Sequence, residues 1–488
     1  MLSDAETSAL RPSNAPLPDP LADMHQRMQR SAQWHPNQMA GRRWPVACVS
    51  LEITQRCNLD CTLCYLSDSS EAVRDFPLEE VFRRIDIIHE HYGPGTDVQV
   101  SGGEPTLRRR DELVAIVRRL RQRGLRASLF TNGIKATRSL LIELAQAGLT
   151  NVAFHVDTTQ QRAGYANETE LNALRREYID RARDLPLSVF FNTTMHAGNF
   201  DDVAMLAAFF KSNADVVRLA SFQLQAETGR GVLGAREGTL DNDSVAARLQ
   251  RGAGTPLRFN VLMAGHHDCN RSAVMLVVNG YAYDAFEDGA FFQRFMRETA
   301  DMTLDRGTPW RALRSLLIGA ARRPRLLLAT AAWALRFAWK ARGKLITARG
   351  RIHKLTFFTH NFMDACSLDR ERIDACVFMA ITQDGPLSMC AYNARRDQYL
   401  LRPLATSSGP WQPLGASTGH VSTFPIKLLK GRAREGWLRE HRGGRSPLVE
   451  EANPWVFEAS SSCGLRPGRM RHSGQPARRT EGNGGAGR

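Results

Sequence analysis

The sequence has few cysteines, no early hydrophobic run, and no acidic residue in one long stretch of its second half. Nine cysteines in 488 residues are too few and too unevenly spaced for a secreted disulfide scaffold. The first residues, MLSDAETSALRPSNAPLPDP, lack the apolar core that signal peptides carry. We therefore expect a cytoplasmic protein whose thiols stay reduced and free to bind metal.

The stretch without Asp or Glu runs from Arg306 to Lys354 and carries 13 Lys and Arg residues. A second basic stretch, Ile426 to Arg488, has 13 basic and 6 acidic residues. These two stretches have net charges of +13 and +7, whereas the whole chain has +15. Positive charge is therefore local and marks particular surfaces. No nucleic-acid recognition motif accompanies it, which argues against a specific nucleic-acid partner.

Six short runs rich in β-branched and aromatic residues predict buried strands in the first half of the chain. They are VSLEIT (49–54), DVQVSGG (97–103), RASLFTNG (126–133), NVAFHVD (151–157), LSVFFNTTM (187–195) and DVVRLASFQLQ (215–225). Helical patterns lie between them at 78–92, 111–124 and 139–148. This alternation predicts parallel strands joined by crossover helices. The expected fold class is α/β, a partial (β/α)6 barrel of the TIM type, with its chemistry at the carboxyl ends of the strands.

Polar residues cluster at those strand ends. They are Gly102, Gly103, Glu104 and Pro105 after the second strand, Thr131 and Asn132 after the third, Asp157 after the fourth, Asn192 and Thr194 in the fifth, and Gln223 and Gln225 in the sixth. Any one of them is explained equally well as a turn residue. A polar group after every strand favours a binding site.

Three cysteines follow the first predicted strand in the segment CNLDCTLCYLS. Cys57, Cys61 and Cys64 offer thiolates, the preferred ligands of iron–sulfur clusters. Three thiolates can hold three irons of a [4Fe–4S] cube and leave the fourth iron open to a small molecule. A structural zinc ion needs a fourth ligand, which the loop does not provide. Zinc with a distant fourth ligand, or plain buried thiols, remain the alternatives.

The spacing C-x3-C-x2-C, with Tyr65 beside the last cysteine, resembles the signature of the radical S-adenosylmethionine (SAM) enzymes, and GGEP at 102–105 is a second match. The resemblance covers about residues 48–230. It implies a [4Fe–4S] cluster whose open iron binds SAM, and reductive cleavage of SAM to a 5′-deoxyadenosyl radical that takes hydrogen from a substrate. It further implies that a flavodoxin- or ferredoxin-like protein donates the electron. The residues that it implies for SAM binding are Tyr65, Gly102, Gly103, Glu104, Pro105, Thr131, Asn132, Asp157, Asn192 and Thr194.

Four further cysteines follow the predicted barrel. Cys269 stands in GHHDCNRS, and Cys366, Cys376 and Cys390 stand between residues 360 and 393. Four thiolates suffice for an auxiliary [4Fe–4S] cluster if the fold gathers them. Their loose spacing is equally compatible with ordinary buried cysteines.

The segments at 154–182, 192–203, 218–231 and 360–366 resemble the tetraether-lipid synthase branch of the radical SAM enzymes, whose members were formerly described as pterin methyltransferases. This resemblance implies a lipid or other membrane-associated substrate and carbon–carbon bond formation. The archaeal members carry additional cysteines, whereas the first 47 residues here contain none. A peptide or pterin substrate is the alternative, and an iron–sulfur or RNA-binding scaffold is the non-enzymatic one. No cobalamin-binding region is evident.

The acid-free segment contains WRALRSLLIGAARRPRLLLATAAWALRFAWKARGKL (310–345), in which Pro324 is expected to begin a second helix. Its apolar core is too short to cross a bilayer. Arg, Lys and Trp beside an apolar helix predict an element at the inner membrane surface, and a hairpin packed on the barrel is the alternative. The expected division of the chain is an extension (1–47), the radical SAM core (48–230), an auxiliary region in two parts (231–305 and 355–405), the basic insert (306–354) and a largely disordered tail (406–488).

Overall fold

The computed structural model describes residues 1–230, 240–302, 314–315, 318–319, 321 and 323–414. At its centre is a sheet of eleven strands in the order β11-β10-β1-β2-β3-β4-β5-β6-β9-β7-β8, and β12 and β13 form a separate ribbon. The strands are Cys48–Thr54 (β1), Asp97–Gly102 (β2), Arg126–Thr131 (β3), Leu149–His155 (β4), Ser188–Met195 (β5), Val217–Leu224 (β6), Asn270–Val278 (β7), Tyr281–Asp284 (β8), His353–Asn361 (β9), Phe378–Thr382 (β10), Gly385–Ser388 (β11), Leu404–Thr406 (β12) and Gly409–Trp411 (β13).

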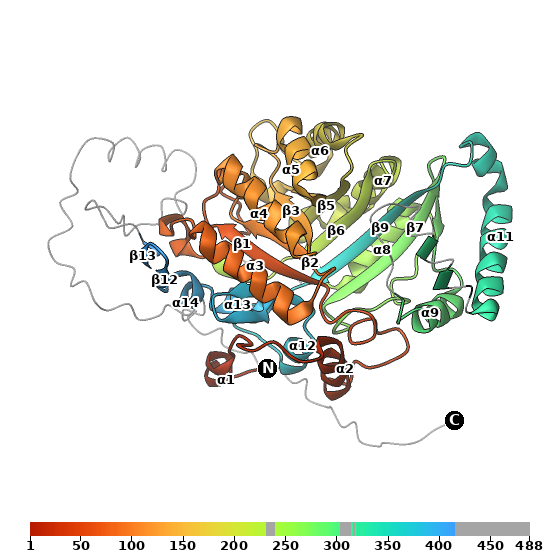
Figure 1. The fold of residues 1–488 in the computed structure, drawn as a ribbon. Coiled ribbons are helices and arrows are strands. Elements are labelled where there is room, and N and C mark those ends of the chain that lie inside the picture. Colours follow the sequence, from red (N-terminus) through yellow and green to blue (C-terminus); the bar gives the residue numbers. More distant parts are fainter. Residues whose placement is uncertain (231–239, 303–313, 316–317, 320, 322, 415–488) are drawn as a thin grey trace, which may run out of the picture.

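Helices precede, follow and connect these strands (Figure 1). The helices are Asp4–Ala9 (α1), Pro20–Arg30 (α2), Leu78–Tyr92 (α3), Arg110–Gln122 (α4), Arg138–Ala147 (α5), Glu168–Ala182 (α6), Val203–Ser212 (α7), Asn242–Ala253 (α8), Gly289–Glu298 (α9), Pro324–Thr347 (α11), Arg370–Asp374 (α12), Met389–Ala394 (α13) and Asp397–Leu400 (α14). Helices α3, α4 and α5 coincide with the three helical patterns of the sequence to within two residues.

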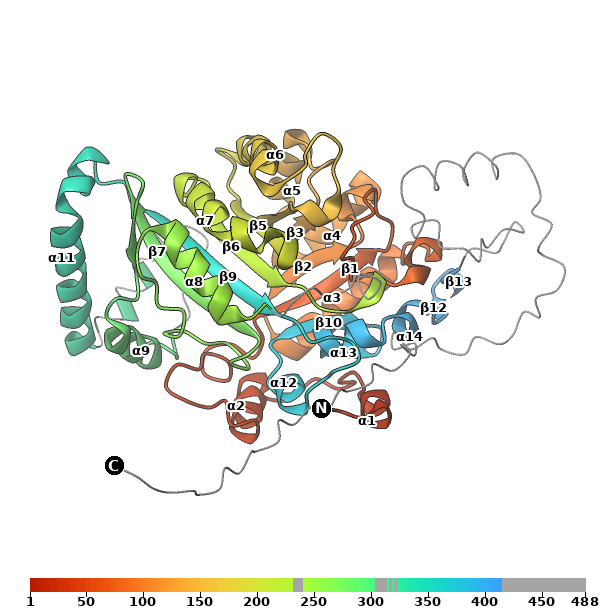
Figure 2. The same cartoon turned by 180° about the vertical axis from the view of Figure 1, so that it is seen from behind.

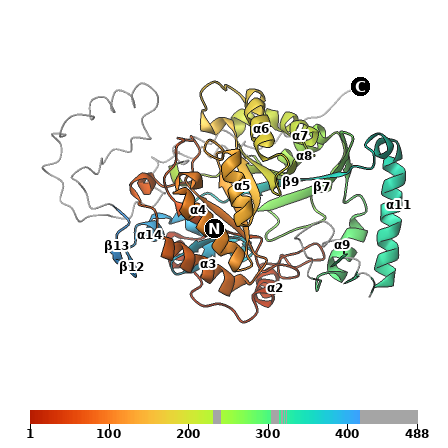
Figure 3. The same ribbon diagram turned by 45° about the horizontal axis from the view of Figure 1, so that its top comes forward.

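The strands β1 to β6 run parallel and stand next to one another in sequence order. Every residue of β1 is buried, as expected for a strand covered on both faces. A helix follows each of these six strands, α3 to α8 in order, and these helices pack on the outside of the curved sheet (Figure 3). The predicted partial (β/α)6 barrel is therefore confirmed.

The sheet continues on both sides of the barrel with strands from the second half of the chain. Strand β10 runs parallel to β1 at one side, and β9 runs parallel to β6 at the other. Register places His360 of β9 between Gln223 of β6 and Asn270 of β7. These long-range pairings bring the region with the later cysteines to the same sheet that carries the first three.

The N-terminal segment lies largely against this later region (Figure 2), and Ser13 also contacts His91 of the barrel helix α3. The Leu2 N–H donates to the Leu368 carbonyl oxygen at 2.7 Å. The Arg27 Nε donates to the Asp374 carbonyl oxygen at 2.7 Å. Residues 1–47 thus support the segment that carries the later cysteines.

Helix α11 stands at the far edge of the sheet, beyond β7 (Figures 1 and 2). It begins at Pro324, which occupies the first helical turn as the sequence predicts. The expected preceding helix and the disordered tail fall largely outside the described residues. Within the described part of the chain, no helix is both long enough and apolar enough to cross a membrane.

Candidate functional site

Cys57, Cys61 and Cys64 lie on the loop after β1, and all three line one large cavity. The cavity, with its mouth, contains ≈ 1380 Å³ of space. Thr62 ties the loop to the segment after β4, because its N–H donates to the Thr159 carbonyl oxygen at 2.9 Å. The three predicted ligands therefore face one space, as the binding of a single group requires.

Whether these thiols suit a single metal ion or a larger cluster depends on the distances between them. Ligands at about 2.3 Å from a tetrahedral zinc ion lie about 3.8 Å from one another. Among the described residues, the one group of three possible metal ligands whose atoms all lie within 4.8 Å of one another is His266, His267 and Asp268. The three thiols after β1 do not form such a close group, which favours ligands on separate irons of a cube over a preformed zinc site.

Positive charge lies beside the thiol loop. The buried Arg230 donates from Nη2 to the Sγ atom of Cys64 at 3.0 Å, and its guanidinium lies 3.7 Å from Asp60. Burial raises the pKa of Cys61, and the neighbouring Cys64 raises it further. Thiolates in such a place require compensating positive charge, which a bound metal cluster provides.

The glycine pair at the end of β2 presses against the chain just ahead of Cys57. A Cβ atom on Gly102 would lie 2.0 Å from the Thr54 carbonyl oxygen, and one on Gly103 would lie 2.2 Å from the Arg56 carbonyl oxygen. The φ angle of Gly102 is also +121°, which favours glycine. The space left by the missing side chains is filled by the protein's own chain, which sets the cysteine loop against β2. Both glycines also line the cavity.

Tyr65 and Glu104 join this loop to its neighbours. The Tyr65 hydroxyl donates to the Gly102 carbonyl oxygen at 2.6 Å. Glu104 is fully buried and accepts hydrogen bonds from the Thr131 hydroxyl and the Asn132 N–H, both at 2.7 Å. Its carboxylate therefore connects the ends of β2 and β3 behind the cavity wall.

A hydrogen-bonded group at the ends of β4 and β5 forms another part of the wall. Asp157 is fully buried and accepts from His155 Nε2 at 2.6 Å, from the Thr194 N–H at 2.7 Å and from the Thr159 N–H at 3.0 Å. Burial by itself would raise the pKa of Asp157, but His155, Thr159 and Thr194 together hold it well below its usual range. The Oδ1 atom of Asn192 is buried without a hydrogen-bond partner among the described residues, so it is available to a ligand.

Most residues predicted to bind the cofactor reach the cavity. Those that line it are Cys57, Cys61, Cys64, Tyr65, Gly102, Gly103, Thr131, Asn132, Asn192 and Thr194. Glu104, Pro105 and Asp157 are buried and do not line it, so they support the wall. The sequence reasoning did not single out His155 and Glu52, which do line it. His155 stands two residues before Asp157 at the same strand end, and this position could have identified it as a residue of the cavity.

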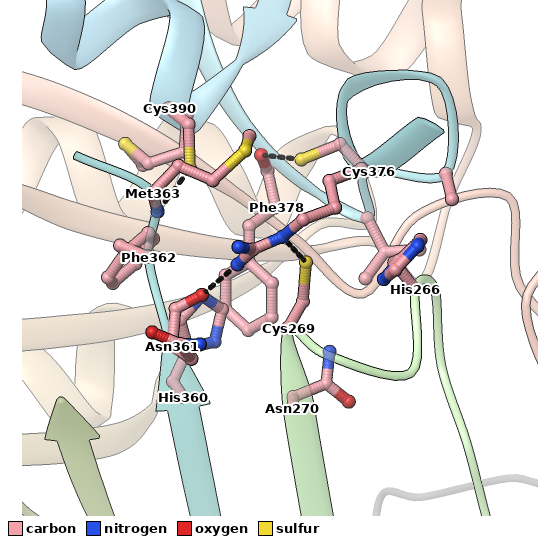
Figure 4. A pocket seen from close by; sticks show the side chains of 14 residues that line it. His266, Cys269, Asn270, His360, Asn361, Phe362, Met363, Cys376, Phe378 and Cys390 are labelled. Carbon is pink, nitrogen blue, oxygen red and sulfur yellow. Dashed lines mark hydrogen bonds between the residues drawn. The ribbon is translucent and has the colours of Figure 1, made fainter. Parts of the chain in front are cut away.

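A second, smaller cavity gathers three of the four cysteines predicted for an auxiliary cluster (Figure 4). Cys269 directly precedes β7, Cys376 precedes β10, and Cys390 lies in the first turn of α13. The fourth, Cys366, does not line the cavity. It is exposed and disulfide-bonded.

Two buried histidines and an arginine complete this second site. His266 and His360 line the cavity, and burial lowers the pKa of His266 to about 4 and that of His360 to about 3. Both are therefore neutral imidazoles at pH 7, the form that binds metal. Arg372 donates from Nε to the Cys269 Sγ atom at 3.4 Å and from Nη2 to the Asn361 carbonyl oxygen at 2.6 Å. Burial raises the pKa of Cys269 to about 11, which Arg372 partly offsets.

The two cavities share part of their walls. Phe362 and Met389 line both of them. A buried ion pair between Glu52 of β1 and Arg396 fixes the region around α13 to the barrel, and the Tyr392 hydroxyl donates to the same carboxylate at 2.9 Å. The second thiol site is thereby held beside the first.

The fold is a barrel of six parallel strands with three thiols on the loop after its first strand, an arrangement that fits a metal cluster at the strand ends. Residues 51–210 match the family model of the radical SAM superfamily. This match covers about a third of the chain, and it includes the loop with the three thiols, the end of β1 and the strands β2 to β5. Members of the superfamily are enzymes that use a [4Fe–4S] cluster and SAM, so both expected cofactors are those of the family.

Curated relatives match over little more than a third of the chain. They include a 7,8-dihydro-6-hydroxymethylpterin dimethyltransferase of Methanocaldococcus jannaschii, 28% identical over 37% of this chain and 37% of the relative. A probable GTP 3′,8-cyclase of Pyrococcus abyssi is 30% identical over 38% of this chain and 59% of the relative. A PqqA peptide cyclase of Bradyrhizobium diazoefficiens is 31% identical over 36% and 46%. The chain thus spans between about a third and three fifths of these relatives.

Solved structures match at low similarity. SuiB of Streptococcus suis bound to S-adenosylmethionine is 16% identical over 43% of this chain and 46% of SuiB, with a TM-score of 0.33. The hydrogenase maturase HydG of Carboxydothermus hydrogenoformans is 15% identical over 48% and 56%, with a TM-score of 0.35. At these values the likeness does not bear on the site.

Proposed function

We propose that this protein is a radical SAM enzyme whose Cys57, Cys61 and Cys64 hold a [4Fe–4S] cluster. The observation that carries the proposal is that these thiols line one cavity together with the strand ends of a (β/α)6 barrel. Three thiolates leave one iron open. When bound, the cluster and SAM supply a 5′-deoxyadenosyl radical, formed with one added electron and the release of methionine, which takes hydrogen from a substrate carbon.

The chain's own residues would bind and orient SAM in this cavity. Thr131 and Asn132 at the end of β3 and Thr194 at the end of β5 present polar side chains to the cavity. The unpaired Oδ1 atom of Asn192 accepts a hydrogen bond from a ribose hydroxyl or an amino group. Asp157 acts indirectly in this proposal, because its oxygens already accept from groups of the protein.

We propose an auxiliary [4Fe–4S] cluster in the second cavity, held by Cys269, Cys376 and Cys390. Cys366 can serve as the fourth ligand only after its disulfide is reduced and its segment moves. His360 already lines the cavity, and its Nδ1 atom has no hydrogen-bond partner within the described part of the chain. It is the alternative fourth ligand.

The shared wall gives the auxiliary cluster a role. A substrate held in the larger cavity against Phe362 and Met389 lies between the two thiol sites. The auxiliary cluster can then bind the substrate or accept the electron released when the product forms. A flavodoxin- or ferredoxin-like protein is the proposed electron donor for SAM cleavage, and the proposed location is the cytoplasm.

For the substrate we propose a lipid or other membrane-associated molecule, with carbon–carbon bond formation as the reaction. Apolar side chains that line the larger cavity support this choice, among them Leu59, Leu63, Phe130 and Leu224. A peptide or a pterin is the second candidate, because relatives are named for a peptide, GTP and a pterin.

The first test is cluster content and SAM cleavage. Anaerobically reconstituted protein should hold about eight irons, from two [4Fe–4S] clusters. The variant C57A/C61A/C64A should hold about four irons and form no 5′-deoxyadenosine with dithionite and SAM. Cleavage that persists in this variant would refute the radical SAM assignment, and four irons in the wild type would refute the auxiliary cluster.

The second test concerns the substrate. Deuterated lipid extract, deuterated peptide and deuterated pterin are each offered with SAM and dithionite. Mass spectrometry then measures deuterium in 5′-deoxyadenosine. Label from the lipid alone supports the proposal. Label from a peptide or pterin, with none from lipid, contradicts the lipid substrate and leaves the radical chemistry intact.

A further inference from the structure

Helix α11 packs on the protein with one face only. Leu326 and Ala341 are buried on that face. Trp333 packs against Phe291, with ring centroids 6.2 Å apart, and Phe337 contacts Tyr283 at 5.6 Å. These positions follow the three- and four-residue spacing of one helix face. The helix is therefore seated on α9 and β8 through an aromatic cluster.

The opposite face is also apolar, and it is exposed. Leu328 and Leu335 are each 71% exposed, Trp339 is 71% exposed and Ile346 is 78% exposed. Spacings of seven, four and seven residues put these four side chains on one line along the helix. The solvent-facing side of a surface helix normally carries polar residues. A helix that is apolar on two opposite faces usually has a binding partner on each of them.

The charges around this exposed face indicate which kind of partner binds it. Residues 306–354 contain 13 basic and no acidic residues. Two basic side chains point toward the protein, because Arg336 pairs with Asp288 at 2.9 Å and Lys340 pairs with Glu287 at 2.7 Å. Arg342 lies over the Trp339 ring, 4.5 Å from its centroid, beside the exposed line.

We propose that this outer face of α11 binds the surface of an anionic phospholipid membrane, with the helix lying flat in the headgroup region. Leucine, isoleucine and tryptophan side chains would enter the interface while arginine and lysine contact the phosphates. A second copy of the chain is disfavoured as the occupant, because two copies of an acid-free segment repel each other. The proposal rests on α11 alone and is independent of the radical chemistry.

The test compares sedimentation of the full chain with two kinds of vesicle. One contains phosphatidylglycerol and phosphatidylcholine, and the other contains phosphatidylcholine alone. We expect binding to the anionic vesicles only, with release by salt because ions screen the attraction. The variant L335Q/W339Q should lose at least tenfold in partitioning. The control I142Q changes an exposed residue of α5, 38% exposed, and should bind as the wild type does.

A second variant, L328Q/I346Q, repeats the test with the other exposed side chains of the line. Circular dichroism checks that all variants are folded, and analytical ultracentrifugation measures their mass without lipid. Equal binding by the wild type and both double variants would overturn the proposal. So would a dimer that both double variants abolish, since the face would then be an interface between copies.

Discussion

Asp157 offers a sharp test of how the cavity wall is held. In the variant D157N one carboxylate oxygen becomes an NH2 group. The carboxylate of the wild type accepts from His155 Nε2 at 2.6 Å and the Thr194 N–H at 2.7 Å through one oxygen, and from the Thr159 N–H at 3.0 Å through the other. His155 can change tautomer and accept from the new amide. A backbone N–H cannot accept, so one is left facing another donor: that of Thr194 in this orientation of the amide, or that of Thr159 if the amide is flipped.

The magnitude follows from these bonds. Leaving one buried donor unpaired costs about 1–3 kcal/mol, and a hydrogen bond to a charged group contributes about 1.5–3 kcal/mol. We therefore expect D157N to lower the free energy of unfolding by about 2–4 kcal/mol. SAM affinity should fall as well, because His155 and Thr194 line the cavity. Anaerobic urea unfolding and equilibrium dialysis with labelled SAM measure the two effects.

The pH dependence adds an independent check. The pKa of Asp157 is held below its usual range in the folded state, so its contribution is fully present above the usual pKa of about 4 and is lost as the pH falls below it. The stability difference between wild type and D157N should stay constant from neutral pH down to about pH 5 and shrink below about pH 4. The control D111N changes an exposed carboxylate and should show no measurable difference. If D157N behaves like D111N, or if the difference grows toward low pH, the reasoning is wrong.

Three further substitutions test other parts of the site. Because Gly103 leaves no room for a Cβ, G103A should retain less than half of the iron of the first cluster, whereas G343A on α11 should retain all of it; iron analysis measures both. R396M leaves the buried Glu52 carboxylate without its ion-pair partner and with neutral hydrogen-bond donors only, and should lower the free energy of unfolding by about 3–5 kcal/mol, measured by urea unfolding. R230Q removes a positive donor from Cys64 and should make the first cluster's reduction potential more negative, measured by a redox titration followed by electron paramagnetic resonance; an unchanged potential would show that Arg230 does not act on the cluster.

The barrel could be predicted from the sequence because each of its strands and helices is specified by a pattern within a few consecutive residues. Each predicted strand is a short run of buried residues, and the six observed strands begin and end within about two residues of the predictions. The helix at 78–92 is reproduced without change as α3. The carboxyl ends of parallel strands lie along one edge of the barrel. Residues at those strand ends could therefore be predicted to line one cavity.

Long-range packing could not be predicted in the same way. Strands β9 and β10 join the sheet beside β6 and β1, more than a hundred residues away in sequence, and no local pattern specifies these neighbours. The cavity that holds Cys269, Cys376 and Cys390 depends on that pairing. Cysteine spacing alone gave no reason to separate Cys366 from the other three. The part played by Asp157 was likewise hidden, since sequence does not tell a residue that lines a cavity from one that supports its wall.

The wall shared by the two cavities leads to a last prediction. Phe362 lines both cavities, so a substrate in the larger one is held against it on the side of the second thiol site. F362A removes the ring and should leave SAM cleavage nearly unchanged, because the residue stands in the wall shared with the second cavity and is not among the proposed SAM ligands. Product formed per 5′-deoxyadenosine should fall several-fold, since a substrate radical that is poorly placed is quenched before the bond closes. The control F209A truncates a partly buried phenylalanine of α7 that lines neither cavity, and it should keep the wild-type ratio. Quantifying both products by mass spectrometry gives the ratio directly. A wild-type ratio in F362A would mean that the two sites do not act on one substrate, and the auxiliary cluster would then need another role.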